Sequence, residues 1–305
     1  MRLIAVVGPT ATGKSDLAMA LARAYYGEII NADAMQLYRG LDVGTAKATP
    51  AERAEMPHHL LDVLDVTETA SVAAYQRAAR AKVEQVLAAG RTPVLVGGSG
   101  LYVQAVVDEL DFPGTDPDLR AELAAELDRV GPAALHARLA TVDPAAAAAV
   151  LPSNGRRIVR ALEVIALTGR PFAARLPEAA APRYDAVLLG LDRPTAELDA
   201  RIARRVARMF GAGLVAETRA LLPGLRDGQT ASRALGYQQV LAELDGDRED
   251  LEKAAADTVV ATRRFVRRQR SWFRRDRRIV WLTSENSDAS DVVDRARAAI
   301  TASVR

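Results

Sequence analysis

Cysteine is absent from the 305-residue sequence, which excludes disulfide bonds and zinc sites that use cysteine ligands. Histidine occurs only three times, and the spacing of His58, His59 and His136 is not that of metal ligands, so packing or hydrogen bonding is favoured. No apolar run approaches the roughly 20 residues that a membrane-spanning helix needs. The apolar run at the start, Leu3 to Val7, is too short for a signal peptide. We therefore expect a cytoplasmic protein without a membrane segment.

Acidic and basic residues nearly balance, giving a net charge of +2, but the basic residues are unevenly distributed. The segment from Arg263 to Arg278 contains nine arginines and one acidic residue, Asp276. Such a helix could be a solvated face anchored by buried aromatic side chains, or a surface that contacts nucleic-acid phosphates. The excess of arginine favours the phosphate-contacting surface, whereas Trp272 and Trp281 are expected in the core.

One motif stands out: residues 8–15 read Gly-Pro-Thr-Ala-Thr-Gly-Lys-Ser and fit the phosphate-binding pattern G-x-x-x-x-G-K-[ST]. An apolar run precedes it and helix-forming residues follow it, which is the strand–loop–helix context that the pattern requires. Backbone N–H groups and the helix N-terminus attract phosphate in such a loop, Lys14 adds a positive charge, and the Ser15 hydroxyl can ligate Mg²⁺. A diphosphate or triphosphate is therefore expected to bind Gly8, Pro9, Thr10, Ala11, Thr12, Gly13, Lys14 and Ser15.

Further strand candidates alternate with helical stretches along the chain. The apolar runs lie at 28–31, 59–64 (the weakest), 93–96, 186–191 and 279–282. This alternation predicts an α/β fold with a parallel sheet core, like that of the P-loop NTPases, flanked by helices. Ligands of such sheets bind at the carboxyl ends of the strands.

Residues 113–182 have a different character. They begin and end in proline-containing segments, and helical patterns at 118–130, 132–141, 143–150 and 155–167 lie between these without a clear strand. We interpret 113–182 as a mostly helical insertion domain in a core formed by 1–112 and 183–305.

A carboxylate is expected near the phosphate loop, but not where a nucleoside triphosphatase keeps its magnesium-binding aspartate. The strand candidate at 93–96 is followed by Gly97, Gly98 and Ser99, without an acid. Asp33 follows the second strand instead, where we expect it beside the loop as a general base for an incoming amine or hydroxyl. A helix or turn cap is an equally simple role for Asp33. We interpret residues 35–47 as a substrate-facing loop in which Gln36 could read the edge of a base.

Seven segments, in this order, resemble the tRNA dimethylallyltransferase family. They are the phosphate loop, Asn31-Ala-Asp-Ala-Met-Gln-Leu-Tyr38, Gly44-Thr-Ala-Lys47, Pro57-His-His-Leu-Leu-Asp62, Val96-Gly-Gly-Ser-Gly-Leu-Tyr102, Arg160-Ala-Leu-Glu163 and Ala234-Leu-Gly-Tyr237. The resemblance implies transfer of the dimethylallyl group from dimethylallyl diphosphate to N6 of the adenine 3′-adjacent to the anticodon in tRNA, with release of diphosphate. It also implies that the loop holds the donor's diphosphate rather than ATP, so the missing aspartate is not needed.

The resemblance also assigns roles to residues. Asp33 would be the general base at N6, Lys14 and Ser15 would act on the diphosphate and Mg²⁺, and Arg219 would bind the leaving diphosphate. The positions implied to contact tRNA are Asp33, Ala34, Met35, Gln36, Ser99, Arg120, Arg156, Arg157, Arg160, Arg233, Gly236, Tyr237 and Gln238. Ala34 stands where the family usually has serine, which removes a hydroxyl near the tRNA base. We expect the helical insertion to close over the anticodon stem-loop, which is too large for a cleft in the core.

Two other functions remain open. A small-molecule or nucleotide kinase shares the loop and the sheet, and would turn over ATP without strong, salt-dependent RNA binding. A non-catalytic RNA-binding protein would bind tRNA whether or not Asp33 and Lys14 are changed. No obligate protein partner is evident, so a monomer is expected.

Overall fold

The structure is a computed structural model that describes residues 2–172, 181–246, 249–283 and 289–303. The chain divides into two compact units, unit 1 with residues 1–108 and 181–305 and unit 2 with residues 109–180. Residues 173–180, with Pro177 of the predicted insertion, lie outside the described residues.

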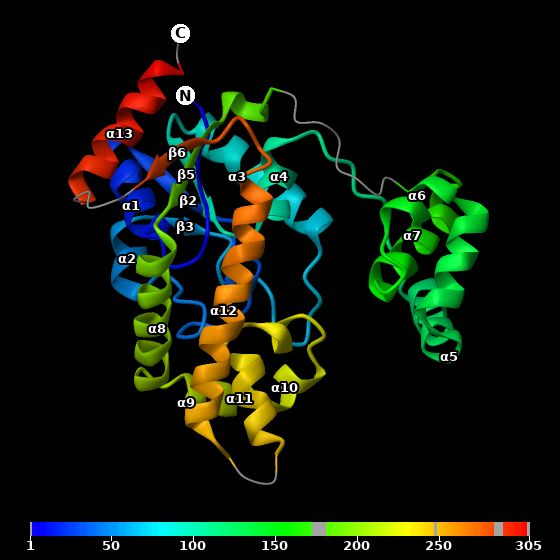
Figure 1. Ribbon diagram of the computed structural model, residues 1–305. Helices are drawn as coiled ribbons and strands as arrows, with labels where there is room; N and C mark the ends of the chain where they lie inside the picture. The colour runs from blue at the N-terminus through cyan, green and yellow to red at the C-terminus, as the bar shows by residue number, and fades with distance from the viewer. Residues whose placement is uncertain (1, 173–180, 247–248, 284–288, 304–305) are drawn as a thin grey trace. The chain divides into compact units, whose positions relative to one another are not determined.

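Unit 1 contains six parallel strands that form one sheet in the order β3-β2-β4-β1-β5-β6 (Figure 1). The strands are β1 Ile4–Val7, β2 Gly27–Asn31, β3 His58–His59, β4 Thr92–Gly97, β5 Val187–Asp192 and β6 Val280–Thr283. The predicted α/β fold with a parallel sheet is confirmed.

The third strand is shorter than predicted, because β3 ends at His59 rather than residue 64. Leu60 and Asp62 have φ angles of 61° and 57°, in the left-handed region that extended backbone cannot include. The Asp62 carboxylate accepts hydrogen bonds from Lys47 and Arg53, each at 2.6 Å. The segment after β3 is therefore a turn fixed by ion pairs.

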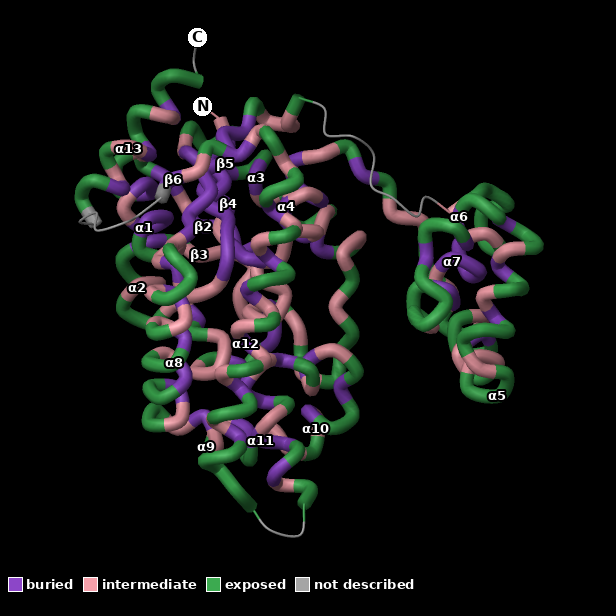
Figure 2. The backbone as a smooth tube through the Cα atoms, in the orientation of Figure 1, coloured by how far each residue is buried: buried purple, intermediate pink, exposed green. Residues whose placement is uncertain are grey.

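Helices cover both faces of the sheet. The helices nearest the sheet are α1 Lys14–Ala24, α3 Val72–Ala88, α4 Gly100–Val107 and α13 Ala289–Ala302. Ala5 and Val7 pack in one cluster with α3 and α4, whereas Ile4 and Val6 pack in a second with α1 and α13. Because both faces are buried (Figure 2), the strands are continuous apolar runs rather than alternating ones.

The rest of unit 1 is mainly helical. Its helices are α2 Pro50–Glu55, α8 Thr195–Gly211, α9 Leu214–Ala220, α10 Leu222–Asp227, α11 Tyr237–Leu244 and α12 Leu251–Phe273. Leu198, Ile202 and Val206 of α8 pack against Val266 of α12. This contact holds the two long helices together beside the carboxyl ends of the strands.

Unit 2 is helical, with α5 Pro117–Val142, α6 Pro144–Ala149 and α7 Gly155–Thr168. The helical path of α5 breaks at Gly131, which has φ 79°, immediately before Pro132. This is the boundary predicted between the helical patterns 118–130 and 132–141. Leu135, Leu139 and Ile158 are fully or nearly fully buried between the helices.

A buried carboxylate lies at the centre of the polar contacts in unit 2. Glu163 is 0% exposed and accepts hydrogen bonds from Arg120 at 2.6 Å, Arg160 at 2.8 Å and the Thr115 hydroxyl at 2.6 Å. Burial alone would raise the pKa of Glu163, but the hydrogen bonds from Arg120, Thr115 and Arg160 lower it to about 2. Because its pKa is lowered, this carboxylate stabilises the fold fully at pH values above 4.5, its ordinary pKa. The contribution is lost as the pH falls toward 2.

We predict that Glu163→Gln lowers the local unfolding free energy of unit 2 by about 2 kcal/mol at neutral pH, because two guanidinium groups lose a charged acceptor. Hydrogen exchange of the amides in residues 155–168 measures this change. Glu122→Gln, at an exposed position of α5, is the control and should leave the exchange unchanged. Equal exchange in all three proteins between pH 4.5 and 7 would show that the buried carboxylate does not stabilise the unit.

Candidate active site

The phosphate loop joins β1 to α1, the context that its sequence predicts. Gly8 and Gly13 have φ angles of 131° and 100°, which favour glycine. A Cβ atom on Gly8 would also lie 2.3 Å from the carbonyl oxygen of Leu191. Among the described residues, no hydrogen-bond acceptor contacts the N–H groups of residues 11–15. These groups are therefore available to an anion.

The first half of the loop is fixed by protein contacts. The Lys14 ammonium and the Thr12 hydroxyl donate to the carbonyl oxygen of Pro9 at 2.6 and 2.9 Å. The Thr10 N–H donates to Oε1 of Gln269 at 3.0 Å, and Nε2 of Gln269 donates to the carbonyl oxygen of Gly98 at 2.9 Å. One side chain of α12 thus ties the loop to the turn after β4.

Positive charge is concentrated at the loop. Burial and the neighbouring Arg205 lower the pKa of Lys14 to about 7, and the carboxylate of Asp33 opposes the shift. Burial also lowers the pKa of Arg205, against the effect of Asp33. Lys14, Arg205 and Asp33 therefore lie close together. Two basic side chains face one carboxylate, and this excess of positive charge suits a bound anion.

Asp33 reaches this site although its strand is not adjacent to β1. We expected the end of β2 beside the loop, but β4 lies between the two strands. All three strands are parallel, so their carboxyl ends still share one edge of the sheet. Oδ1 of Asp33 accepts from the Met35 N–H at 2.9 Å, and within the described chain its other oxygen has no hydrogen-bond donor. One oxygen caps a turn, which leaves the other for chemistry.

The loop that follows Asp33 is held from several sides. The Ala34 N–H donates to the Ser99 hydroxyl at 3.2 Å, and the Gln36 side chain donates to the Thr45 carbonyl oxygen at 3.2 Å. Lys47, whose side chain is 1% exposed, pairs with Asp42 at 2.7 Å and with Asp62. These contacts fix the backbone of residues 35–47.

Tyr237 is a core residue in this structure. It is 0% exposed, its hydroxyl accepts from the Gly44 N–H at 3.0 Å, and it donates to Glu217. Burial and Glu217 raise the pKa of Tyr237 above its ordinary value. Tyr237 thus supports the loop from behind, and its predicted tRNA contact stays a prediction.

Arg219 and Arg205 have different surroundings. The Arg219 guanidinium pairs with Glu249 at 2.5 Å and is half exposed, and no contact of the described residues joins it to the phosphate loop. Arg205, which sequence reasoning missed, lies beside Lys14 and Asp33 and donates to the Thr45 carbonyl oxygen at 3.2 Å. The spacing of Arg201, Arg205 and Arg208 along one helix could have indicated a shared face.

The remaining predicted tRNA contacts differ in exposure. Arg233, Gln238 and Arg156 are exposed, Gly236 is buried, and Arg157 is exposed with its guanidinium 5.7 Å from the ring centre of Phe172. Arg120 and Arg160 donate to Glu163, although the Arg120 side chain is still 45% exposed.

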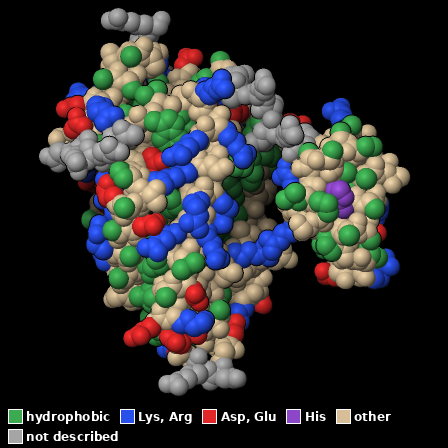
Figure 3. All heavy atoms as spheres, in the orientation of Figure 1, with side chains coloured by type: hydrophobic (Ala, Val, Ile, Leu, Met, Phe, Trp, Pro, Cys, Tyr) green, Lys and Arg blue, Asp and Glu red, His purple; other side chains and the backbone are tan. Residues whose placement is uncertain are grey.

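The arginine-rich segment has an inner and an outer side. Arg270 donates to the Asp192 carboxylate at 2.9 Å, and Arg278 donates to Asp108 at 2.6 Å. Phe273 and Val266 are buried. The exposed arginines are Arg264, Arg267, Arg268, Arg274, Arg275 and Arg277. Figure 3 shows basic side chains gathered over α12.

Asp192 ends β5, the other neighbour of β1. This is a position from which an acid could hold Mg²⁺ in a nucleoside triphosphatase. Here the Asp192 carboxylate accepts from Arg270 and from the Arg193 N–H at 2.8 Å, and it is 8% exposed. It is therefore committed to holding α12.

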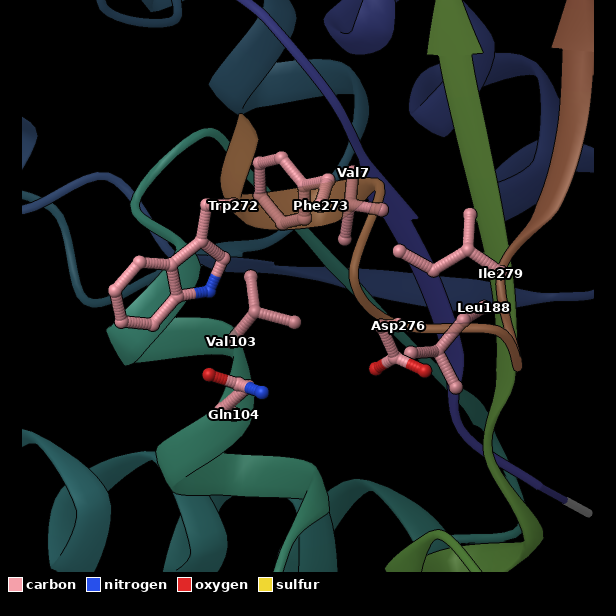
Figure 4. Close-up of a pocket in the computed structure, with 8 residues that line it drawn as sticks. All are labelled: Val7, Val103, Gln104, Leu188, Trp272, Phe273, Asp276 and Ile279. Atoms are coloured by element: carbon pink, nitrogen blue, oxygen red, sulfur yellow. The ribbon is translucent and has the colours of Figure 1, made fainter. Parts of the chain in front are cut away.

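A small cavity of about 10 Å³ lies between β1, α4 and the end of α12, with room for about one water molecule. Figure 4 shows Trp272, Val103 and Gln104 facing it. Trp272 also packs against Gly100, where a Cβ atom would lie 2.2 Å from the indole ring. Trp272 is partly buried and packs against the core, in line with the prediction, and the cavity is too small for a prenyl group.

Within the described ranges, no three histidine, aspartate or glutamate side chains are grouped so that they could hold a metal ion. In those same ranges, no helix has both the length and the apolar character that crossing a bilayer requires.

Comparisons with known proteins identify the family. The family model described as IPP transferase matches residues 36–276. The tRNA dimethylallyltransferase of Streptomyces coelicolor is 63% identical over 292 residues, which are 95% of this chain and 93% of that protein. That of Thermobifida fusca is 63% identical over 304 residues, 98% of this chain and 94% of that protein.

Solved structures agree with this result. The tRNA isopentenylpyrophosphate transferase of Bacillus halodurans has 39% identity and a TM-score of 0.73, covering 99% of this chain and 96% of that one. A eukaryotic dimethylallyltransferase that acts on tRNA shares the fold, with a TM-score of 0.81 at 24% identity over 98% of this chain and 78% of that one. The chain therefore belongs to the tRNA dimethylallyltransferase, or IPP transferase, family.

Proposed function

We propose that this protein transfers the dimethylallyl group from dimethylallyl diphosphate to N6 of the adenine 3′-adjacent to the anticodon in tRNA, and releases diphosphate. One observation carries the proposal: loop N–H groups without an acceptor among the described residues, together with Lys14 and Arg205, lie beside Asp33, whose second carboxylate oxygen has no donor in that same part of the chain. The relatives' names supply the two substrates, tRNA and the dimethylallyl donor. A kinase activity is disfavoured because the Asp192 carboxylate, the acid that could hold Mg²⁺ for ATP, accepts hydrogen bonds from Arg270 instead.

The chemistry follows from these groups. N6 of the adenine attacks the allylic carbon, the carbon–oxygen bond to diphosphate breaks, and the proton of N6 passes to Asp33. Negative charge grows on the leaving oxygen, where Lys14 and Arg205 interact more strongly in the transition state than in the ground state. We assign to Arg205 the role that the sequence resemblance gives to Arg219.

The donor set also fits Mg²⁺. The Ser15 hydroxyl is exposed at the start of α1, and hydroxyl, carboxylate and diphosphate oxygens are the hard ligands that this ion prefers. When bound, Mg²⁺ would neutralise part of the charge on the leaving diphosphate.

The RNA would lie on basic surfaces. The exposed arginines of α12 supply phosphate contacts, and the other contacts to the RNA come from Ser99, Gln36 and the exposed residues of the predicted tRNA-contacting set. We also propose that unit 2 contacts the anticodon stem-loop, and that the protein acts in the cytoplasm, where tRNA is modified, as a monomer.

The direct test of the activity is incubation of the protein with unmodified tRNA, Mg²⁺ and donor labelled in its prenyl group. We expect label in the RNA at the adenine beside the anticodon. Label that stays in the donor, or hydrolysis of ATP in its place, would overturn the proposal.

For the general base, we predict that Asp33→Asn lowers the transfer rate about 10²–10⁴-fold, because the amide cannot accept the N6 proton. Gel-shift affinity for tRNA should stay within about threefold of the wild type, since Asn keeps the turn cap on Met35. Undiminished transfer would reject Asp33 as the base.

For the leaving group, we predict that Arg205→Gln lowers the single-turnover rate about 10²–10³-fold, whereas Arg219→Gln has a much smaller effect. The two variants remove the same charge from neighbouring helices, so each controls for the other. A larger loss of rate in Arg219→Gln than in Arg205→Gln would show that Arg219 binds the leaving diphosphate.

A further inference from the structure

We propose that Arg201 and Arg193 are positioning residues, which aim backbone N–H groups of the phosphate loop at the diphosphate without touching it. The inference deepens the proposed function and rests on it for the identity of the natural ligand. It concerns two residues that do not belong to the loop motif.

Two guanidinium groups hold two consecutive carbonyl oxygens of the loop from outside. Nε of Arg201 donates to the carbonyl oxygen of Ala11 at 2.7 Å, and Nε of Arg193 donates to that of Thr12 at 2.8 Å. In a trans peptide the C=O and N–H bonds point in opposite directions. Holding the Ala11 and Thr12 oxygens outward therefore turns the N–H groups of Thr12 and Gly13 the other way.

The N–H groups set in this way are the ones that a ligand can use. Neither the Thr12 nor the Gly13 N–H has an acceptor among the described residues. Two residues before Thr12, the N–H of Thr10 is already bonded to Gln269. The arginines thus act on two of the peptide units whose N–H groups are open to an anion.

The backbone at this point needs external support. Ala11 has φ 64°, a left-handed conformation that is strained for a non-glycine residue. Such a conformation persists only where its surroundings hold it. The hydrogen bond from Arg201 to the carbonyl oxygen of the same residue supplies that restraint.

The geometry points to the position of the donor atom, rather than the charge, as the useful property. Arg193 also pairs with Glu197 at 2.5 Å, so part of its charge is compensated. Lys14 and Arg205 already supply cations at the loop. Arg201 and Arg193 repel each other, and this repulsion adds to burial in lowering the pKa of Arg201.

Three substitutions at Arg201 separate the two properties. In Arg201→Gln, Nε2 lies the same number of bonds from Cα as Nε of arginine, so the donor is kept and the charge is lost. In Arg201→Lys a methylene stands at that position, so the charge is kept and the donor moves one bond further from Cα. Arg201→Met has neither. The same substitutions at the exposed Arg204, on the same helix, are the controls.

The measurement is calorimetric titration of each full-length protein with inorganic diphosphate and Mg²⁺, after thermal unfolding has shown that the variants fold. We expect Arg201→Gln to bind diphosphate within about threefold of the wild-type affinity. Arg201→Lys and Arg201→Met should bind it roughly tenfold more weakly, which is the contribution of one hydrogen bond from a charged group. Weakening by Gln and Met but not by Lys would show that charge acts instead. Equal binding by all proteins would overturn the inference.

Failure of the inference and of the proposed function can be told apart. If the wild type transfers prenyl groups to tRNA while all Arg201 variants bind diphosphate equally, only the positioning role falls. If no prenyl group is transferred but Arg201→Gln still binds diphosphate more tightly than Arg201→Lys and Arg201→Met, the positioning role stands and the proposed function falls. A wild type that does not bind diphosphate would overturn the positioning role directly.

Discussion

The site depends on cationic charge held at low solvation beside an open backbone loop. Burial lowers the pKa of both Lys14 and Arg205, and the neighbouring Arg205 further disfavours the charged state of Lys14. Without an anion this arrangement is unfavourable, because two like charges lie in a region of reduced dielectric constant. A bound diphosphate would reverse that balance. The surrounding structure can be understood as the support that keeps these charges in place.

Helix α12 is a central part of that support. Its inner side chains hold the site, since Gln269 joins the phosphate loop to the turn after β4 and Arg270 holds the end of β5. Its outer side carries exposed arginines. A single helix therefore links the surface proposed for RNA to the loop proposed for the donor. This explains why a basic segment far along the sequence is rich in arginine and also carries Trp272 and Phe273, which pack in or against the core.

Features set by local sequence could be predicted, and those set by long-range packing could not. The phosphate loop, five of the strands and the break at Gly131 follow from short patterns of glycine, proline and apolar residues. The placement of β4 between β1 and β2 is a property of the whole sheet, and no local pattern encodes it. Arg205 was missed for the same reason, because only the packing of α8 brings it to Lys14.

The same limit applies to the surroundings of Tyr237 and Arg120, whose predicted tRNA contacts stay predictions. A tyrosine in a family motif can contact a substrate or support a loop, and only burial distinguishes these. An arginine on a predicted helix can face solvent or a buried acid, and Glu163 sits 43 positions along the chain from Arg120. Contacts of this kind depend on tertiary structure, which a single sequence does not display.

The central claim is most directly tested through the proton of Lys14. With a pKa of about 7, this side chain is mostly neutral in the free protein at pH 8, and an anion bound in the phosphate loop should restore its charge. Calorimetric titration with diphosphate and Mg²⁺ in two buffers of different ionisation enthalpy measures the protons taken up. The account predicts that the wild type takes up close to one proton more than Lys14→Arg, which is charged throughout. Equal proton uptake by the two proteins would contradict it.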